Sequence, residues 1–267
     1  MRYVFDHDYH IHSFLSDCSN DSAEDTKRIL EYAGQNDLKQ ICLTDHFWDE
    51  AVPGASEWYK PQNYKHISQA LPLPQTEKNR FLFGCETDMD RYMTLGISRE
   101  RFESFDFVVI PTTHLHMNDL TIAPEDRNVE GRAKCWVNRL EKVLNMQLPF
   151  HKIGIAHLVT SLIAPDSREE FLAVLRMLPE TDMGRLFTKA ASLGVGIELN
   201  SFDVRCTEKE AETILRPLQI AKQCGCKFYM GSDAHHPADL DEAKAMFERA
   251  IDWLELTEDD KFVLTLN

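Results

Sequence analysis

The chain is short of basic residues and has no long apolar run, and each absence excludes a class of partner. Its 267 residues include 29 Lys and Arg against 44 Asp and Glu, for a net charge of −15. We expect no nucleic-acid partner, because a phosphate backbone requires a basic surface. No apolar stretch approaches the roughly 18 residues of a membrane span. The first residues also lack the apolar core of a signal peptide, so we expect a cytoplasmic protein without a membrane partner.

The cysteines do not form a zinc-ribbon pattern. There are seven, an odd number, and no two have the spacing C-x-x-C. This usage is typical of reduced, mostly buried thiols in the cytoplasm. Eleven glycines and eleven prolines are too few for a low-complexity chain, and a hydrophobic content of 43% allows a sizeable core.

Short apolar runs recur along the chain and predict β-strands. After a first strand that ends near residue 12, the runs lie at residues 40–44, 81–84, 107–110, 153–156, 195–199 and 227–230. Strands that are apolar throughout are typical of a parallel sheet buried on both faces. About seven such units favour an α/β barrel, TIM-like, that forms a single domain over residues 1–267.

Amphipathic segments separate these runs and predict helices. The helical spacing of apolar residues covers 132–146, 169–178, 183–193, 209–222 and 238–254. Ser22–Asp25 resembles a capping box ahead of one more helix. Residues 51–75 contain four prolines and indicate an irregular excursion with one or two helical turns.

Metal-ligand residues follow one apolar run after another. His10 and His12 close the first strand, and residues two apart on a strand project from the same face. Further candidates at or just after later runs are His46, Glu86, His114, His157, Asp233 and His235, with Asp17 in the loop after the first strand. In a parallel barrel the C-terminal ends of the strands meet at one face, where active sites lie. The sequence therefore predicts one common site.

The chemistry of these residues favours a polynuclear metal centre. Six histidines and three carboxylates exceed the roughly three protein ligands of a single catalytic zinc, so two or three divalent ions with a bridging carboxylate are expected. A nitrogen and oxygen ligand set without thiolate suits Zn²⁺, Mn²⁺ or Fe²⁺. Close-set ions lower the pKa of a shared water and clamp the oxygens of an in-line displacement, which is chemistry for phosphate-ester hydrolysis.

The motifs resemble those of the PHP (polymerase and histidinol phosphatase) family over nearly the whole chain. They are His10-Ile11-His12, Thr44-Asp45-His46, Glu86, His114, His157 and Gly231-Ser232-Asp233-Ala234-His235. The resemblance implies a distorted (β/α)7 barrel with a trinuclear metal centre. It implies that His10, His12, Glu86 and Asp233 hold one ion, that Glu86 bridges to a second held by His114 and His157, and that Asp17, His46 and His235 hold the third. Asp17 in its place is similar to the histidinol-phosphatase branch.

Other residues leave alternatives open. The fourth-strand motif Thr112-Thr113-His114-Leu115-His116 departs from the Ser-Val-His of that branch, so His116 is a second candidate beside His114. Arg205 could grip a phosphate bidentately or be a solvated loop residue. Glu198 could support a ligating imidazole or form a structural salt bridge.

The function that we expect is hydrolysis of a small phosphorylated metabolite by a metal-bridging hydroxide. Glu86 and Asp233 would be the catalytic carboxylates and Arg205 would neutralise phosphate oxygens. The resemblance makes L-histidinol phosphate, and thus histidine biosynthesis, the first candidate. Three alternatives are a phosphodiesterase or nucleotidase on the same metals, an amidohydrolase-type metal hydrolase, and a non-catalytic metal-binding accessory domain.

Overall fold

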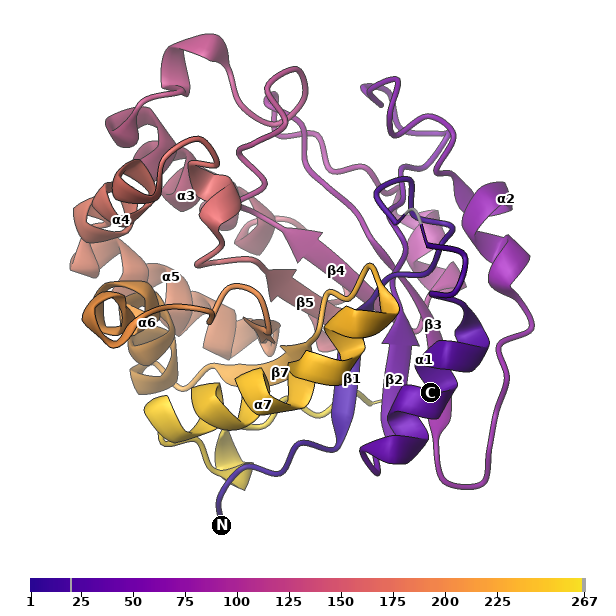
Figure 1. Ribbon diagram of the computed structural model, residues 1–267. Coiled ribbons are helices and arrows are strands. Elements are labelled where there is room, and N and C mark those ends of the chain that lie inside the picture. The colour runs from indigo at the N-terminus through magenta and orange to yellow at the C-terminus, as the bar shows by residue number, and fades with distance from the viewer. Residues whose placement is uncertain (20, 266–267) are drawn as a thin grey trace.

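Seven parallel strands form one sheet that curls into a barrel (Figure 1). The computed structural model describes residues 1–19 and 21–265, so the last two residues of the predicted 1–267 domain lie outside the described residues. Each strand pairs with the next along the chain, in the order β1 to β7. The strands are β1 (His7–Ile11), β2 (Gln40–Leu43), β3 (Arg80–Glu86), β4 (Phe107–Pro111), β5 (Ile153–Ala156), β6 (Gly196–Asn200) and β7 (Lys227–Gly231).

The barrel closes where β7 returns to β1. Ile11 forms a parallel bridge with Ala234, the amide of His12 donates to the carbonyl of Ala234 at 3.0 Å, and the amide of Asp233 donates to that of His10 at 2.7 Å. The contacts lie just past the end of β7, at the rim of the barrel. The first and last motifs of the sequence are therefore hydrogen-bonded neighbours.

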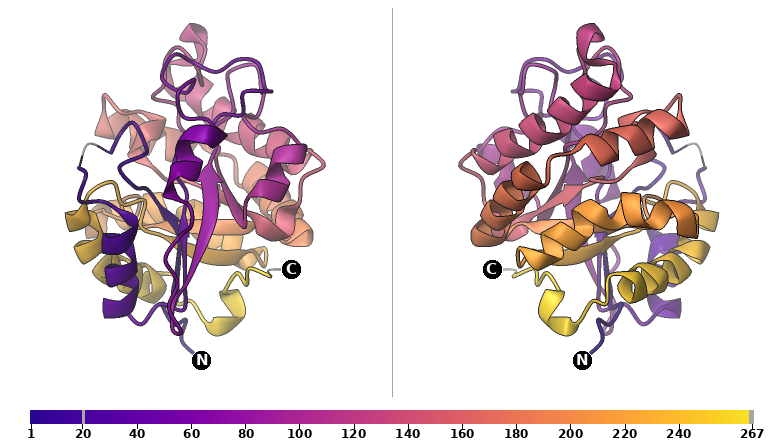
Figure 2. Two further views of the ribbon diagram at one scale, coloured as in Figure 1. Left: turned by 90° about the vertical axis from the view of Figure 1, so that its right-hand side faces the viewer. Right: turned by 90° about the vertical axis from the view of Figure 1, so that its left-hand side faces the viewer.

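Helices cover the outside of the barrel unevenly (Figures 1 and 2). They are α1 (Thr26–Gln35), α2 (Tyr64–Ile67), α3 (Val129–Leu144), α4 (Arg168–Met177), α5 (Glu180–Leu193), α6 (Glu208–Gln223) and α7 (Pro237–Trp253). The link from β2 to β3 contains only the one-turn α2 and a 3-10 turn, and the link from β3 to β4 only a 3-10 turn. The predicted α/β barrel is confirmed, in a distorted form. Among the described helices, none is both long and apolar enough to cross a membrane.

The predicted capping box is wrong. Helix α1 begins after Asp25, whose side chain accepts the amide of Arg28 at 2.8 Å. Glu24, expected near the cap, is instead fully buried, and its carboxylate has no hydrogen-bond partner.

The barrel interior has two layers. The part nearer the N-terminal ends of the strands is filled by an apolar cluster that includes Tyr9, Phe107, Tyr229 and Phe262. Alternation along the strands then places polar side chains above this plug, nearer the C-terminal ends. On β3, for example, Leu82 lies in the interior cluster while Phe83 and Cys85 belong to the outer core. Glu86 is on the same face as Leu82 and so points inward.

A register irregularity in β1 re-aims its histidines. The pairing with β2 shifts between Asp8 and Ile11. Tyr9 packs in the interior cluster whereas Ile11 packs in the outer core, although residues two apart on a regular strand share a face. A bulge of this kind changes the direction of one side chain. It allows Tyr9 to fill the interior while His10 and His12 both face the rim.

Candidate metal centre

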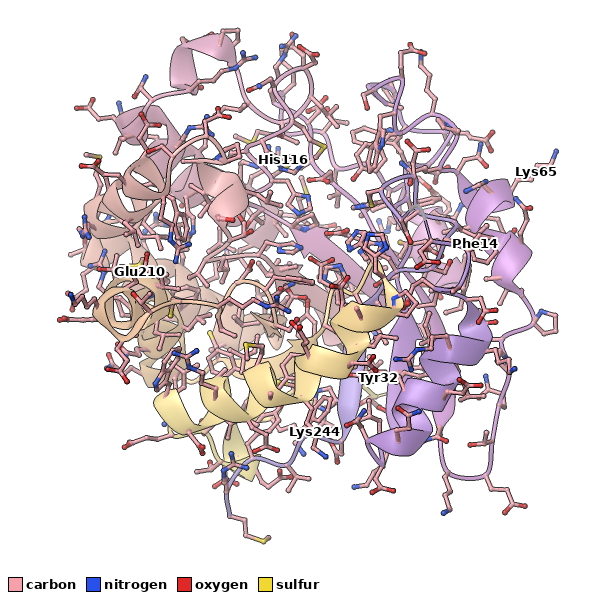
Figure 3. The ribbon with its side chains drawn as sticks, in the orientation of Figure 1. Phe14, Tyr32, Lys65, His116, Glu210 and Lys244 are labelled. Carbon is pink, nitrogen blue, oxygen red and sulfur yellow. The ribbon has the colours of Figure 1, made fainter. Side chains whose placement is uncertain are left out.

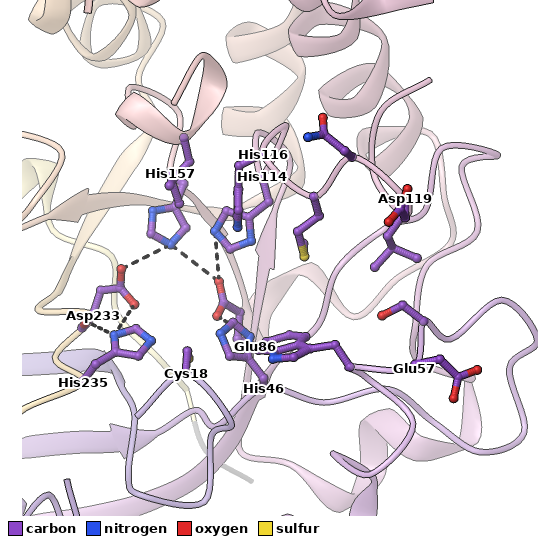
Figure 4. A pocket seen from close by; sticks show the side chains of 16 residues that line it. Cys18, His46, Glu57, Glu86, His114, His116, Asp119, His157, Asp233 and His235 are labelled. Carbon is purple, nitrogen blue, oxygen red and sulfur yellow. Dashed lines mark hydrogen bonds and ion pairs between the residues drawn. The ribbon is translucent and has the colours of Figure 1, made fainter. Parts of the chain in front are cut away.

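Glu86 is the centre of the site. Its carboxylate is fully buried, and imidazole nitrogens of five histidines lie 3.0–3.8 Å from its oxygens. The five are His10, His12, His46, His114 and His157. They come from four different strand ends. Figure 4 shows three of these contacts. The structure thus brings together residues that are far apart in the sequence.

Asp233 is a second carboxylate at the same centre. Its Oδ1 lies 3.4 Å from His10 Nε2 and 3.2 Å from His12 Nε2, and its Oδ2 lies 3.6 Å from His157 Nε2. Asp233 and His157 both have left-handed backbone conformations, with φ of 54° and 62°. Each such conformation costs on the order of 1 kcal/mol in a residue other than glycine. The ends of β5 and β7 therefore hold strained residues whose side chains converge.

A third group lies on one side of Glu86. Ligand atoms of His12, His46 and His235 are within 4.8 Å of one another, and the ring of His12 stacks on that of His235 with centroids 4.2 Å apart. Asp17, predicted to belong to this group, is exposed and is in none of the ligand clusters of the described residues. The turn after β1 presents Cys18 to the cavity instead. The structure therefore does not bring Asp17 to this group.

The donors fit divalent cations. Neither oxygen of Glu86 has a hydrogen-bond partner, since the nearby imidazoles are not in hydrogen-bonding geometry. Burial would raise the pKa of Glu86, but His46 and His10 hold that pKa well below its usual value. Burial would likewise raise the pKa of Asp233, and His10 and His157 lower it. Buried charges of this kind are usually paired or coordinate metals, and nitrogen and oxygen donors suit zinc, manganese or iron.

Acidic groups lie beside the Nδ1 atoms of three of these histidines. Glu198 Oε1 is 2.5 Å from His10 Nδ1, Asp203 Oδ2 is 3.4 Å from His157 Nδ1, and Asp88 Oδ2 is 3.0 Å from His114 Nδ1. Such partners fix the tautomer and the direction of a metal-binding imidazole. Glu198 therefore lies against the imidazole of His10, as expected if it supports that ring, and forms no salt bridge with a lysine or arginine among the described residues.

Gly231 makes the approach of Glu198 to His10 possible. A Cβ at this glycine would overlap Glu198 Oε1 and lie 2.8 Å from His10 Cβ. Gly231 ends β7 beside β6. Its missing side chain therefore leaves the space in which the carboxylate and the imidazole meet.

Sequence reasoning did not identify Asp88 and Asp203. Asp88 lies two residues after Glu86, so alternation along an extended strand could have placed both carboxylates on one face. Asp203 lies in the turn after β6 and has no comparable signal. His114, not His116, is the fourth-strand residue near Glu86, at 3.8 Å. His116 also lines the cavity, and burial lowers its pKa to about 4.

The centre forms the floor of a cavity of about 780 Å³. Its walls come from the irregular segment after β2 and from the loop after β4, and include Glu57, Trp58, Met117 and Asp119 (Figure 4). Among the described residues that line it, none is Lys or Arg.

Arg205 is not at the cavity, contrary to the prediction. Its guanidinium pairs with Glu242 of α7 at 2.9 Å and lies over the ring of Phe202, 4.5 Å from the centroid. Arg205 is also not among the residues that line the cavity.

Comparison with known proteins gives a sequence relative and a similar solved structure. No protein-family model matches the chain. A curated sequence relative, a probable phosphatase from Caldicellulosiruptor bescii, is 25% identical over 233 residues, which are 86% of this chain and 80% of the relative.

The fold is similar to that of a histidinol phosphate phosphatase from Lactococcus lactis, solved in complex with zinc, L-histidinol and phosphate. The TM-score is 0.61 and the identity 18%, over 92% of this chain and 93% of that chain. The sequence relative supports the class of phosphatase and the solved structure supports the fold. The name of the sequence relative is in line with the predicted resemblance, and the likeness to the solved structure confirms the predicted barrel fold.

Proposed function

We propose that the chain hydrolyses the phosphate monoester of a small organic molecule with the help of two or three divalent metal ions. The observation that carries the proposal is the carboxylate of Glu86, which is fully buried, without a hydrogen-bond partner, and within 3.8 Å of five imidazoles. The probable phosphatase among the relatives supports the reaction class.

The ligands follow from the clusters and from the PHP resemblance. His10, His12, Glu86 and Asp233 would hold one ion, Glu86 with His114 and His157 a second, and His46 with His235 a third. When bound, ions in such a site lower the pKa of water and neutralise phosphate oxygens. Zinc, manganese and iron all suit the donors. Glu198 and Asp88, which are hydrogen-bonded to Nδ1 of His10 and His114, would keep the proton on these atoms, so that Nε2 would face the ions.

The cavity lining favours a substrate whose organic part is apolar or positively charged. Trp58, Met117 and Leu162 supply apolar surface, and the walls carry the carboxylates of Asp119 and of Glu57, which is ion-paired with Lys60. A second phosphate or a carboxylate on the substrate would have no basic partner among the described lining residues. This supports L-histidinol phosphate, which has an amine, as the first candidate, and it disfavours a nucleotide.

A phosphate-release assay tests the proposal. The protein would be loaded separately with Zn²⁺, Mn²⁺ and Fe²⁺. Each form would be given L-histidinol phosphate, the phosphate monoester of an uncharged sugar, and a nucleoside monophosphate. Glu86→Gln is the inactive control. We expect release from L-histidinol phosphate to exceed release from the nucleotide at least tenfold. Release from no monoester with any metal would overturn the proposed reaction, and faster release from the nucleotide would overturn the substrate class.

A further inference from the structure

We propose that Tyr59 and Asp88 form a positioning pair that fixes the imidazole of His114 and connects it to His46. The pair would keep two groups of metal ligands in one relative orientation. This inference rests on the proposed metal centre, because it concerns residues that touch its ligands and not the ions. Neither residue was among the predicted site residues.

The pair is a short, buried hydrogen-bond network. The hydroxyl of Tyr59 donates to Asp88 Oδ2 at 2.6 Å, and His114 Nδ1 donates to the same oxygen at 3.0 Å. Tyr59 and Asp88 are both 0% exposed. Because Asp88 occupies Nδ1 of His114, the other nitrogen, Nε2, faces Glu86 Oε1 at 3.8 Å and has no hydrogen-bond partner. Asp88 thus sets which nitrogen of His114 is presented to the centre.

Tyr59 extends the network from His114 to the group formed by His12, His46 and His235. Its hydroxyl lies 3.4 Å from His46 Nδ1, and the two rings meet edge to face at an angle of 87°. Because the hydroxyl group donates its hydrogen bond to Asp88, its oxygen can accept a hydrogen bond from the N–H of His46. One oxygen atom is therefore in contact with partners of both groups.

The network joins distant parts of the chain. Tyr59 belongs to the irregular excursion before α2, next to Trp58 in the cavity wall, whereas Asp88 follows β3 and His114 follows β4. The ring of Trp58 also meets His46 edge to face, with centroids 5.0 Å apart. The hydroxyl of Tyr59 therefore ties one wall of the cavity to the metal ligands.

Arg139 holds the frame in which Asp88 lies. This fully buried guanidinium donates to four backbone carbonyls, those of Met89, Asp90, Thr112 and Thr121. Two of them follow Asp88 directly and the other two flank His114 in the chain. Burial lowers the pKa of Arg139, and the charge of Asp88 opposes that effect. Arg139 thus holds the backbone segments that carry Asp88 and His114 in place.

Tyr59→Phe tests the role of the pair because it removes one oxygen and leaves the ring. Tyr32→Phe is a matched control, since Tyr32 also donates a buried hydrogen bond to a carboxylate, Asp8 Oδ2, at 3.0 Å. Asp8 contacts no ligand imidazole through that oxygen, and Tyr32 lies on α1, well away from His116 at the cavity (Figure 3). Both variants lose the same kind of bond, so a purely structural effect would be equal in the two.

The measurement is the visible absorption of the Co²⁺-loaded protein and the rate at which EDTA removes the ion. We expect Tyr59→Phe to change the Co²⁺ spectrum and to lose the ion about 10-fold faster, within the 10–100-fold range typical of such partners, with Tyr32→Phe unchanged. Asp88→Asn should show a larger loss. A Tyr59→Phe protein with the spectrum and rate of the wild type would overturn the positioning role alone. A wild-type protein that binds no Co²⁺ would overturn the metal centre as well.

Discussion

Glu86 and Glu24 are both fully buried glutamates without a hydrogen-bond partner at either carboxylate oxygen, yet their surroundings differ completely. Glu86 lies among five imidazoles, and these hold its pKa well below the usual value in spite of burial. Glu24 lies before α1, and burial together with the charges of Asp239, Asp21 and Asp25 raises its pKa to about 8, against the opposing effect of Arg28.

The difference shows that burial alone does not make a metal site. The same side chain is an anion in one place and a neutral acid at pH 7 in the other, because its neighbours decide which form is cheaper to bury. Only the anion is surrounded by further donors with the chemistry of metal ligands. The centre is therefore defined by the histidines around Glu86 as much as by Glu86.

Replacement of Glu86 should have the largest effect. Glu86→Gln keeps the shape of the side chain but removes the charge that faces the five imidazoles. We expect phosphate release to fall about a thousandfold or more, measured with saturating metal and L-histidinol phosphate. Glu24→Gln is the matched control and should retain activity. An equal loss of activity in the two variants would contradict the conclusion that only Glu86 belongs to the metal site.

Glu24 should instead control stability as a function of pH. Its pKa is about 8 in the folded chain, above the ordinary value near 4.3, so the folded state binds more protons than the unfolded state between these values. Stability must then fall as pH rises through that window. Relative to wild type, Glu24→Gln should gain roughly 3 kcal/mol on going from pH 5 to pH 8, measured by urea unfolding. A gain that does not depend on pH would contradict the assignment.

Gly231→Ala tests whether the contact between Glu198 and His10 contributes to metal binding. The added methyl overlaps Glu198 and so must displace it from His10. We expect a loss of about 10-fold in metal affinity, measured by competition with a chelator. Gly184→Ala is a suitable control, because a Cβ there meets nothing within 4 Å. An unchanged affinity in Gly231→Ala would show that the Glu198 contact is dispensable.

Arg205→Ala should have the smallest effect. Its guanidinium is engaged with Glu242 and Phe202 outside the cavity, and exposed ion pairs contribute about 0–1 kcal/mol. Turnover and KM should each change by less than about twofold. A large rise in KM would restore the sequence-based prediction that Arg205 grips the phosphate.

The fold and most of the site could be predicted from sequence because both depend on local patterns. Apolar runs mark buried parallel strands, and His10, Glu86 and His157 lie at the ends of such runs. Once the strands are parallel, their ends meet at one face, so convergence follows without any knowledge of contacts. The domain limits and the metal ligands assigned by resemblance stay predictions.

What could not be predicted depends on contacts between distant segments. The exposure of Asp17 is decided by the turn that brings Cys18 to the cavity. Tyr59 meets Asp88 only because the irregular excursion folds back over β3, and an irregular segment has no periodicity from which to place a side chain. Arg205 had an acidic partner, Glu242, in a helix more than thirty positions away.

The most direct test is anomalous diffraction from a crystal grown with zinc. The account predicts at least one peak within roughly 2.0–2.3 Å of an imidazole nitrogen of His12 and of carboxylate oxygens of Glu86 and Asp233. Anomalous peaks confined to the surface, with Glu86 still lacking any ligand, would contradict it.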